Sequence, residues 1–163
     1  MSRAQADSLY KDGLTALSKN ANPEAAACFR RALELESELG APSPRTLSYF
    51  GVSLARAGIS FDVAIDAAKR AAYRSEKDPL LYLNLGRVYQ AAGKRICAIK
   101  AFEKGLKICP TSGVLRRELD RLDRRGLPVI RGLSRDHAVN RMLGRVRARV
   151  RSRRSRATAT ARA

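Results

Sequence analysis

The chain has 163 residues, of which 45% are hydrophobic and 29% charged, and its formal net charge at pH 7 is +18. This composition is typical of a folded protein rather than a disordered one, and the length allows one domain with an appendage. No window approaches about 18 uninterrupted apolar residues and the N-terminus has no apolar signal core, so we expect neither a membrane-spanning nor a secreted protein but a cytoplasmic one.

The positive charge is concentrated toward the C-terminal end. Residues 1–113 carry 17 Lys and Arg against 11 Asp and Glu, whereas residues 114–163 carry 16 against 4, and all 16 are Arg. This asymmetry indicates an anionic partner for the last third of the chain. A GC-rich genome that favours Arg codons is an alternative explanation for the choice of Arg over Lys, but it does not remove the charge.

Three cysteines, Cys28, Cys97 and Cys109, have apolar neighbours and neither paired nor metal-ligand spacing. We expect reduced, packed thiols in a cytosolic protein, with a redox or disulfide role as the alternative.

Three glycines, Gly13, Gly51 and Gly86, mark a repeat with spacings of 38 and 35 residues. In the first unit, Ala25 follows Gly13 after 12 residues, and Phe29 comes four residues later. Small residues let two helix backbones approach closely, and the large aromatic fills the space beside the crossing. We expect helices near residues 4–19 and 23–38.

The second unit follows the same pattern less closely. Ala64 comes 13 residues after Gly51, and Ala68 replaces the aromatic residue. One extra residue in the internal turn explains this shift, and we expect helices near residues 44–57 and 61–75.

The third unit matches most completely and predicts helices near residues 79–92 and 95–108. Its pattern consists of Tyr82, Leu85, Gly86, Tyr89, Ala98, Phe102, Gly105 and Pro110.

Residues at the expected helix ends support these boundaries. Asn22, Ser43 and Asp78 each precede a proline, which places an N-cap residue before Pro at the first helical position. Gly58 and Gly93 are expected to end the first helices of the second and third units.

The third unit resembles the tetratricopeptide repeat signature, with Tyr in place of Trp. The resemblance covers about residues 4–125 and implies an all-α, right-handed superhelix of three helix pairs, in which the first helices line a concave groove for a peptide or partner helix. We expect a repeat domain over residues 1–126, with repeats at about 6–40, 44–78 and 79–112 and a capping helix at 113–125.

The resemblance also implies which positions of the first helices face the groove. Transferred by register, they are Tyr10, Leu14, Leu17, Arg45, Ser48, Tyr49, Val52, Arg56, Leu83, Asn84, Arg87 and Gln90. The groove would be apolar at its N-terminal end and basic toward its centre. We hypothesise a ligand with an apolar anchor followed by acidic groups, since the guanidinium group of Arg can bind a carboxylate through two parallel hydrogen bonds. The alternative is that these are ordinary surface residues of a stacking module.

Two specialisations of the family can be compared with this chain. Chaperone-binding members hold a terminal carboxylate with Lys and Asn at positions that are Tyr10 and Leu14 here, so that clamp is absent. The three-repeat chaperones of bacterial type III secretion have similar length, but they are typically acidic and this chain is strongly basic.

The C-terminal region differs from the repeats in composition and pattern. Residues 127–151 are expected to form an extended linker and an amphipathic basic helix, and residues 152–163 a disordered tail. The segment 133–145 is similar to the tail of some small bacterial tetratricopeptide proteins of unassigned function. The arginines expected to meet an anionic partner are Arg145, Arg147, Arg149, Arg151, Arg153, Arg154 and Arg156.

Two roles remain open for this region: it folds back to cap or fill the groove, or its basic helix docks on nucleic acid, an anionic membrane surface or an acidic protein. A solvated charge run without a partner is the third alternative.

No catalytic, metal-binding or cofactor-binding motif occurs in the sequence. His137, the only histidine, follows Asp136 at an expected helix start, and Glu34, Glu36 and Glu38 are expected to form solvated ion pairs. We therefore expect no enzyme, cofactor, metal or small-molecule substrate. The leading hypothesis is a protein-interaction scaffold or adaptor that binds in the groove, with a chaperone-like role as one form of it. The alternative is electrostatic binding of nucleic acid or an anionic membrane through the tail.

Overall fold

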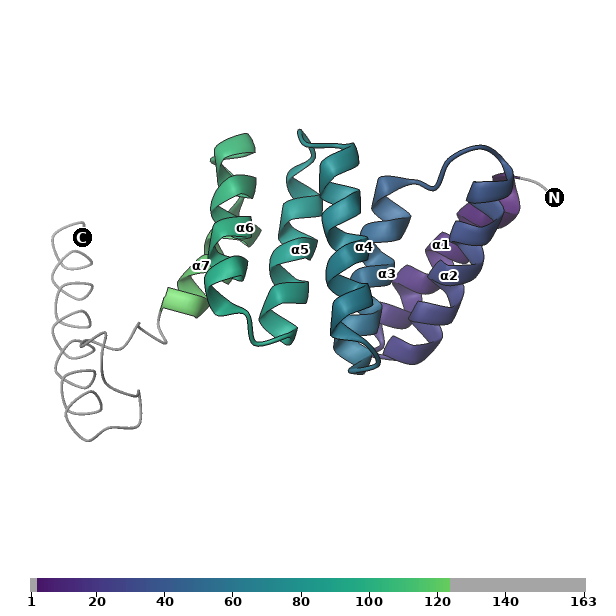
Figure 1. The fold of residues 1–163 in the computed structure, drawn as a ribbon, viewed down its shortest axis with the longest axis horizontal. Helices are drawn as coiled ribbons and strands as arrows, with labels where there is room; N and C mark the ends of the chain where they lie inside the picture. Colours follow the sequence, from purple (N-terminus) through teal and green to yellow (C-terminus); the bar gives the residue numbers. More distant parts are fainter. Residues whose placement is uncertain (1–2, 124–163) are drawn as a thin grey trace, which may run out of the picture. The chain divides into compact units, whose positions relative to one another are not determined.

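The computed structural model describes residues 3–123, and every regular element in this range is a helix (Figure 1). The helices are α1 (Arg3–Ser18), α2 (Asn22–Glu38), α3 (Pro44–Ala57), α4 (Phe61–Arg74), α5 (Pro79–Ala91), α6 (Arg95–Ile108) and α7 (Gly113–Asp123). The chain divides into two units between Leu119 and Asp120, inside α7. The predictions for residues 124–163, including the arginine-rich tail, lie outside the described residues.

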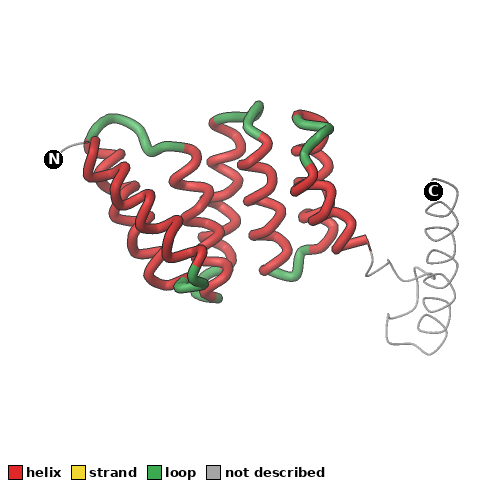
Figure 2. Tube along the Cα trace, turned by 180° about the vertical axis from the view of Figure 1, so that it is seen from behind, coloured by secondary structure: helices red, strands yellow, loops and turns green. Residues whose placement is uncertain are grey.

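The first six helices form three consecutive pairs joined by short turns (Figure 2). α1 packs on α2, α3 on α4 and α5 on α6, while contacts of α3 with α2 and α5, and of α4 with α5, join the pairs into a stack. The all-α superhelix of three helix pairs is therefore confirmed. Among the described residues, no helix is long and apolar enough to cross a membrane.

Each pair closes at its predicted glycine. A Cβ atom added at Gly13 would lie 2.8 Å from the ring of Phe29, and one at Gly86 would overlap the ring of Phe102. At Gly51 the added atom would lie 2.7 Å from the carbonyl oxygen of Ala64. The middle pair therefore packs helix backbone against helix backbone, because it has alanine where the other pairs have phenylalanine.

The extra residue of the second unit lies in a helix and not in the turn, so the predicted position was wrong. The turns inside the three pairs, 19–21, 58–60 and 92–94, have the same length. From its repeat glycine to its end, α3 is one residue longer than α1 and α5. A helix accommodates the insertion at its exposed end, where Gly58 adopts the left-handed conformation (φ 68°) and terminates α3.

Ser43 and Asp78 occupy the predicted N-cap positions before Pro44 and Pro79, whereas the N-cap of α2 is Ala21 and not Asn22. Asp78 accepts a hydrogen bond from the backbone N–H of Leu80 at 3.0 Å, but neither Ser43 nor Asn22 caps its helix through its side chain. Asn22 is the first residue of α2. At the start of α3, Glu36 accepts hydrogen bonds from the backbone N–H of Ser43 and from the hydroxyl of Thr46, each at 2.7 Å.

The prediction of packed thiols was wrong for Cys97. Cys97 is exposed, and Cys28 and Cys109 are half-buried. Alanines fill much of the core instead, because close helix crossings leave little room for larger side chains.

Candidate partner-binding face

Helices α1, α2 and α3 bring an aromatic cluster together near the N-terminal end of the stack. The ring of Tyr10 on α1 lies edge-on to the rings of Phe29 and Tyr49, with centroids 5.9 and 6.0 Å away, and Phe29 stacks on Tyr49 at 5.8 Å. Phe29 is fully buried, whereas the two tyrosines remain partly exposed. Aromatic groups held in this way offer apolar area at small entropic cost, because their rings are already ordered.

A hollow of about 580 Å³ lies beside Tyr10. Its walls come from the start of α1, the end of α2 and the start of α3, and they include Arg3, Asp7 and Arg45. The hollow therefore combines one aromatic ring, that of Tyr10, with charged groups of both signs. Burial raises the pKa of Tyr10, and the neighbouring Tyr49 raises it further.

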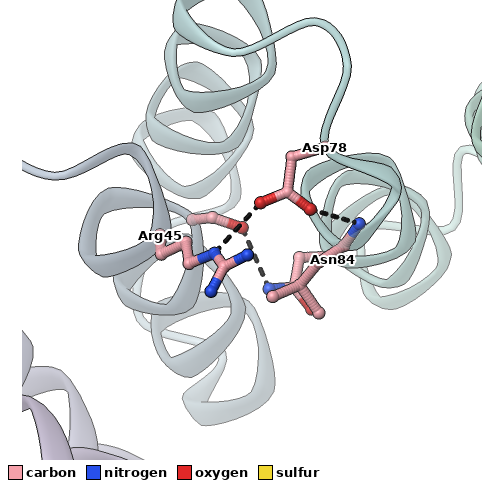
Figure 3. Close-up of polar contacts among 5 residues, drawn as sticks. Arg45, Asp78 and Asn84 are labelled. Atoms are coloured by element: carbon pink, nitrogen blue, oxygen red, sulfur yellow. Dashed lines mark hydrogen bonds and ion pairs between the residues drawn. The ribbon is translucent and has the colours of Figure 1, made fainter.

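A polar network links α3 to α5 on the same face (Figure 3). The Nε of Arg45 donates to an oxygen of Asp78 at 3.0 Å, and this contact raises the pKa of the guanidinium. The amide nitrogen of Asn84 donates to the hydroxyl of Ser48 at 3.0 Å. Asp78 thus both caps α5 and neutralises Arg45. An acidic group of a partner would have to compete with Asp78 for the guanidinium of Arg45.

A second ion pair engages Arg87. Its Nε and Nη2 atoms lie 3.3 and 3.2 Å from Oε1 of Glu118, which is almost fully buried on α7. Arg87 is itself half-buried, with a side-chain exposure of 30%. A pair of this kind is better shielded from solvent than a surface pair, and it links α5 to α7 at Glu118.

The structure places the predicted groove residues at very different depths. Arg45, Arg56 and Gln90 are exposed; Tyr10, Leu14, Tyr49 and Arg87 are half-buried; Leu17, Ser48, Val52, Leu83 and Asn84 are buried. Within residues 3–123, Arg56 forms no ion pair. Binding of a partner at these positions stays a prediction, and the surface that could meet one consists of the exposed and half-buried members.

Sequence reasoning missed the carboxylates of this face. Asp78 was recognised as a cap, but its pairing with Arg45 requires two residues 33 positions apart in the chain. Glu118 could not be distinguished in the sequence from the other charged residues of the last helix. No local signal marks either pairing, since Arg45 and Asp78 are 33 residues apart and Arg87 and Glu118 are 31 residues apart.

Three helix pairs, each closed at a glycine and stacked in chain order, define a helical-repeat protein. No family model matches the chain. A curated relative, small glutamine-rich tetratricopeptide repeat-containing protein 2 of Mycosarcoma maydis, is 29% identical over 116 residues, which cover 71% of this chain. The match spans only 32% of that relative's length.

Solved structures share the fold. The Sgt2 TPR domain from Aspergillus fumigatus has a TM-score of 0.62 at 23% identity, covering 74% of this chain and 78% of its own. The first TPR of Spaghetti (RPAP3), bound to the HSP90 peptide SRMEEVD, also has a TM-score of 0.62 at 18% identity, covering 76% and 94%. PcrH, in complex with the chaperone binding region of PopB, has 0.58 at 14%, covering 75% and 94%. The described residues share the fold of these tetratricopeptide repeat domains, and the resemblance seen in the sequence is confirmed.

Proposed function

We propose that the chain is a protein-interaction adaptor whose first-helix face, made by α1, α3 and α5, binds a short segment of another protein. The observation that carries this proposal is the partly exposed ring of Tyr10, which lines the 580 Å³ hollow and lies edge-on to the ring of Tyr49. Ordered aromatic rings next to a concavity are a suitable seat for an apolar side chain. Support also comes from the fold, since two similar domains were solved with a peptide or a binding region of a partner.

The chemistry of this face favours an apolar anchor over a terminal carboxylate. Tyr10 and Leu14 occupy the positions at which chaperone-binding members of the family hold a carboxylate with Lys and Asn. Arg45 and Arg87 already pair with Asp78 and Glu118. Acidic groups of the partner would therefore be attracted mainly by Arg56, or would have to displace Asp78 from Arg45.

A photo-crosslinking pair tests the proposal in the full chain. A benzoylphenylalanine replacing Tyr10 is expected to capture a defined partner segment from the native host. The same group replacing Phe61, whose ring is 40% exposed at the start of α4, serves as the matched control. Leu14→Asp should abolish the capture at position 10, because it places a charge in an apolar contact.

The competing role of the arginine-rich tail is separated in the same experiment. Deletion of residues 144–163 is expected to leave capture at position 10 intact. Capture that is equal at positions 10 and 61, or that disappears with the tail and is insensitive to Leu14→Asp, would contradict the proposal. That result would favour electrostatic binding through the tail, whose signature is a steep loss of affinity with salt.

A further inference from the structure

A second hollow, of about 460 Å³, lies between α4 and α6 and is here called the outer groove. α4 and α6 both pack on α5, which provides the floor (Figure 1). The floor consists of Tyr82, Leu85 and Tyr89, and the walls include Ala72 of α4 and Ala101 of α6. The two alanines leave a trough beside Tyr82 and Leu85, which are almost fully buried, and beside the half-buried Tyr89. No part of residues 3–123 fills this trough.

The floor residues form one stripe along α5. Positions 82, 85 and 89 are separated by three and four residues, so their side chains lie on one face of the helix. At a rise of about 1.5 Å per residue the stripe is roughly 10 Å long, or two helical turns. A trough of this length between two helices suits an elongated ligand such as a helix.

Lysines surround the outer groove. Lys69 belongs to α4, and Lys100 and Lys104 are one turn apart on α6. The Nζ atom of Lys104 lies 4.9 Å from the centre of the Tyr82 ring, but Lys69 and Lys100 form no ion pair within residues 3–123. Glu76 is the only acidic residue among those that line the hollow.

The charge of the outer groove differs from that of the first-helix face. On the first-helix face, Arg45 and Arg87 pair with Asp78 and Glu118, which leaves Arg56, whereas the outer groove carries three lysines against the single carboxylate of Glu76. Surface lysines alone do not indicate a binding site, but here they border an apolar stripe with a tyrosine at each of its two ends. An amphipathic helix presents the complementary pattern, with apolar residues along one face and charges beside it.

We propose that the outer groove binds an acidic amphipathic helix of a partner protein, with its apolar face on Tyr82, Leu85 and Tyr89 and its carboxylates toward Lys69, Lys100 and Lys104. The helix would occupy the trough between α4 and α6 and pack at the usual spacing of helix pairs, about 8–10 Å between axes. This site is separate from the first-helix face, so one chain could join two partners.

A peptide selection tests the proposal. A library of displayed 14-residue helical peptides is selected on the full chain at about 0.15 M salt, where exposed charges are screened beyond about 8 Å. Counter-selection uses the full chain with Lys69→Glu, Lys100→Glu and Lys104→Glu. Both proteins carry the same arginine-rich tail, so peptides that bind the tail are removed.

We expect the surviving peptides to be acidic, with apolar residues at i, i+3 or i+4, and i+7. Their Kd should rise about tenfold or more in the triple variant. The matched control carries Lys11→Glu, Lys19→Glu and Arg30→Glu, which are exposed in the first repeat, lie outside the hollow and change the net charge equally. The control should leave Kd within about twofold, since its charges are too distant to contact the peptide.

Cys97 reports directly on occupancy, because it is exposed and lines the outer groove. In a chain with Cys28→Ala and Cys109→Ala, saturating peptide should slow alkylation of Cys97 by iodoacetamide about fivefold or more, as expected when the thiol is covered.

Three results would overturn the proposal. The first is that no peptide survives counter-selection, and the second that the survivors are neutral or basic. The third is that they leave Cys97 as reactive as before. Circular dichroism of the lysine variants must show unchanged helix content, and all three positions are exposed, so folding is not expected to suffer.

Discussion

α1 and α3 occupy equivalent positions in their repeats but are buried to very different extents. α1 buries three of its 16 residues, whereas α3 buries eight of its 14. The reason is the position in the stack, since α3 contacts α2, α4 and α5 and α1 packs mainly on α2. The same repeat position can therefore serve a partner in α1 and the core in α3. Paired substitutions, one in each helix, measure this difference.

The repeat glycines should give the largest contrast. We expect Gly51→Ala to lower the free energy of unfolding by about 3 kcal/mol, because the new Cβ meets the fixed backbone of α4, and the helix-propensity gain of up to about 1 kcal/mol does not offset this. Gly13→Ala should cost only about 1 kcal/mol, since the ring of Phe29 can shift toward the partly exposed Tyr10 and Tyr49. Urea unfolding followed by circular dichroism measures both, and equal losses would contradict the contrast.

Apolar groove positions come next. Val52→Ala in α3 should destabilise the fold by about 2 kcal/mol, because the side chain is only 3% exposed and its removal leaves a cavity. Leu14→Ala in α1 should cost less than about 1 kcal/mol, since that side chain is half-buried. In the photo-crosslinking assay the order reverses, and Leu14→Ala should weaken partner capture more than Val52→Ala does. A large stability loss at Leu14 would mean that it is a core residue.

The serine hydroxyls of the two helices give a smaller contrast. Ser48→Ala should cost about 1.5 kcal/mol, because it leaves the amide of Asn84 buried without its partner. Ser18→Ala removes an exposed hydrogen bond to the carbonyl of Thr15 and should change stability by less than about 0.5 kcal/mol. Thermal unfolding midpoints suffice to rank the two variants. A reversed order would show that the Asn84–Ser48 hydrogen bond does not offset the cost of burying its polar groups.

The sequence predicted the fold well because helix stacking depends on local patterns. Gly13, Gly51 and Gly86 define the crossings, and the prolines and glycines define the helix ends to within about two residues. The internal turn of the second repeat was misplaced because a one-residue shift in periodicity does not reveal whether a helix or a turn contains the extra residue.

The candidate site was less predictable, since depth and pairing are tertiary properties. Register placed Ser48, Val52 and Asn84 on the groove side of their helices, but neighbouring helices cover them. The outer groove was not predicted either. Tyr82, Leu85 and Tyr89 match the repeat pattern as core residues, and only the alanines on both sides, together with the lysines of two other helices, turn them into the floor of a hollow.

The smallest expected effect concerns the pH dependence of stability on the α1 side. Burial raises the pKa of Tyr10 above its ordinary value, so the folded state retains the phenol proton at a pH where the unfolded chain has lost it. The resulting stabilisation is complete below about pH 10 and is lost as the pH rises through the folded-state pKa. We expect the unfolding midpoint in urea to fall less steeply above pH 10 in Tyr10→Phe than in the unmodified chain. Tyr73→Phe, at a ring that is 81% exposed, is the control and should leave the slope unchanged. Identical slopes in all three proteins would mean that Tyr10 opens to solvent before the stack unfolds, as a ring on the least buried first helix could do.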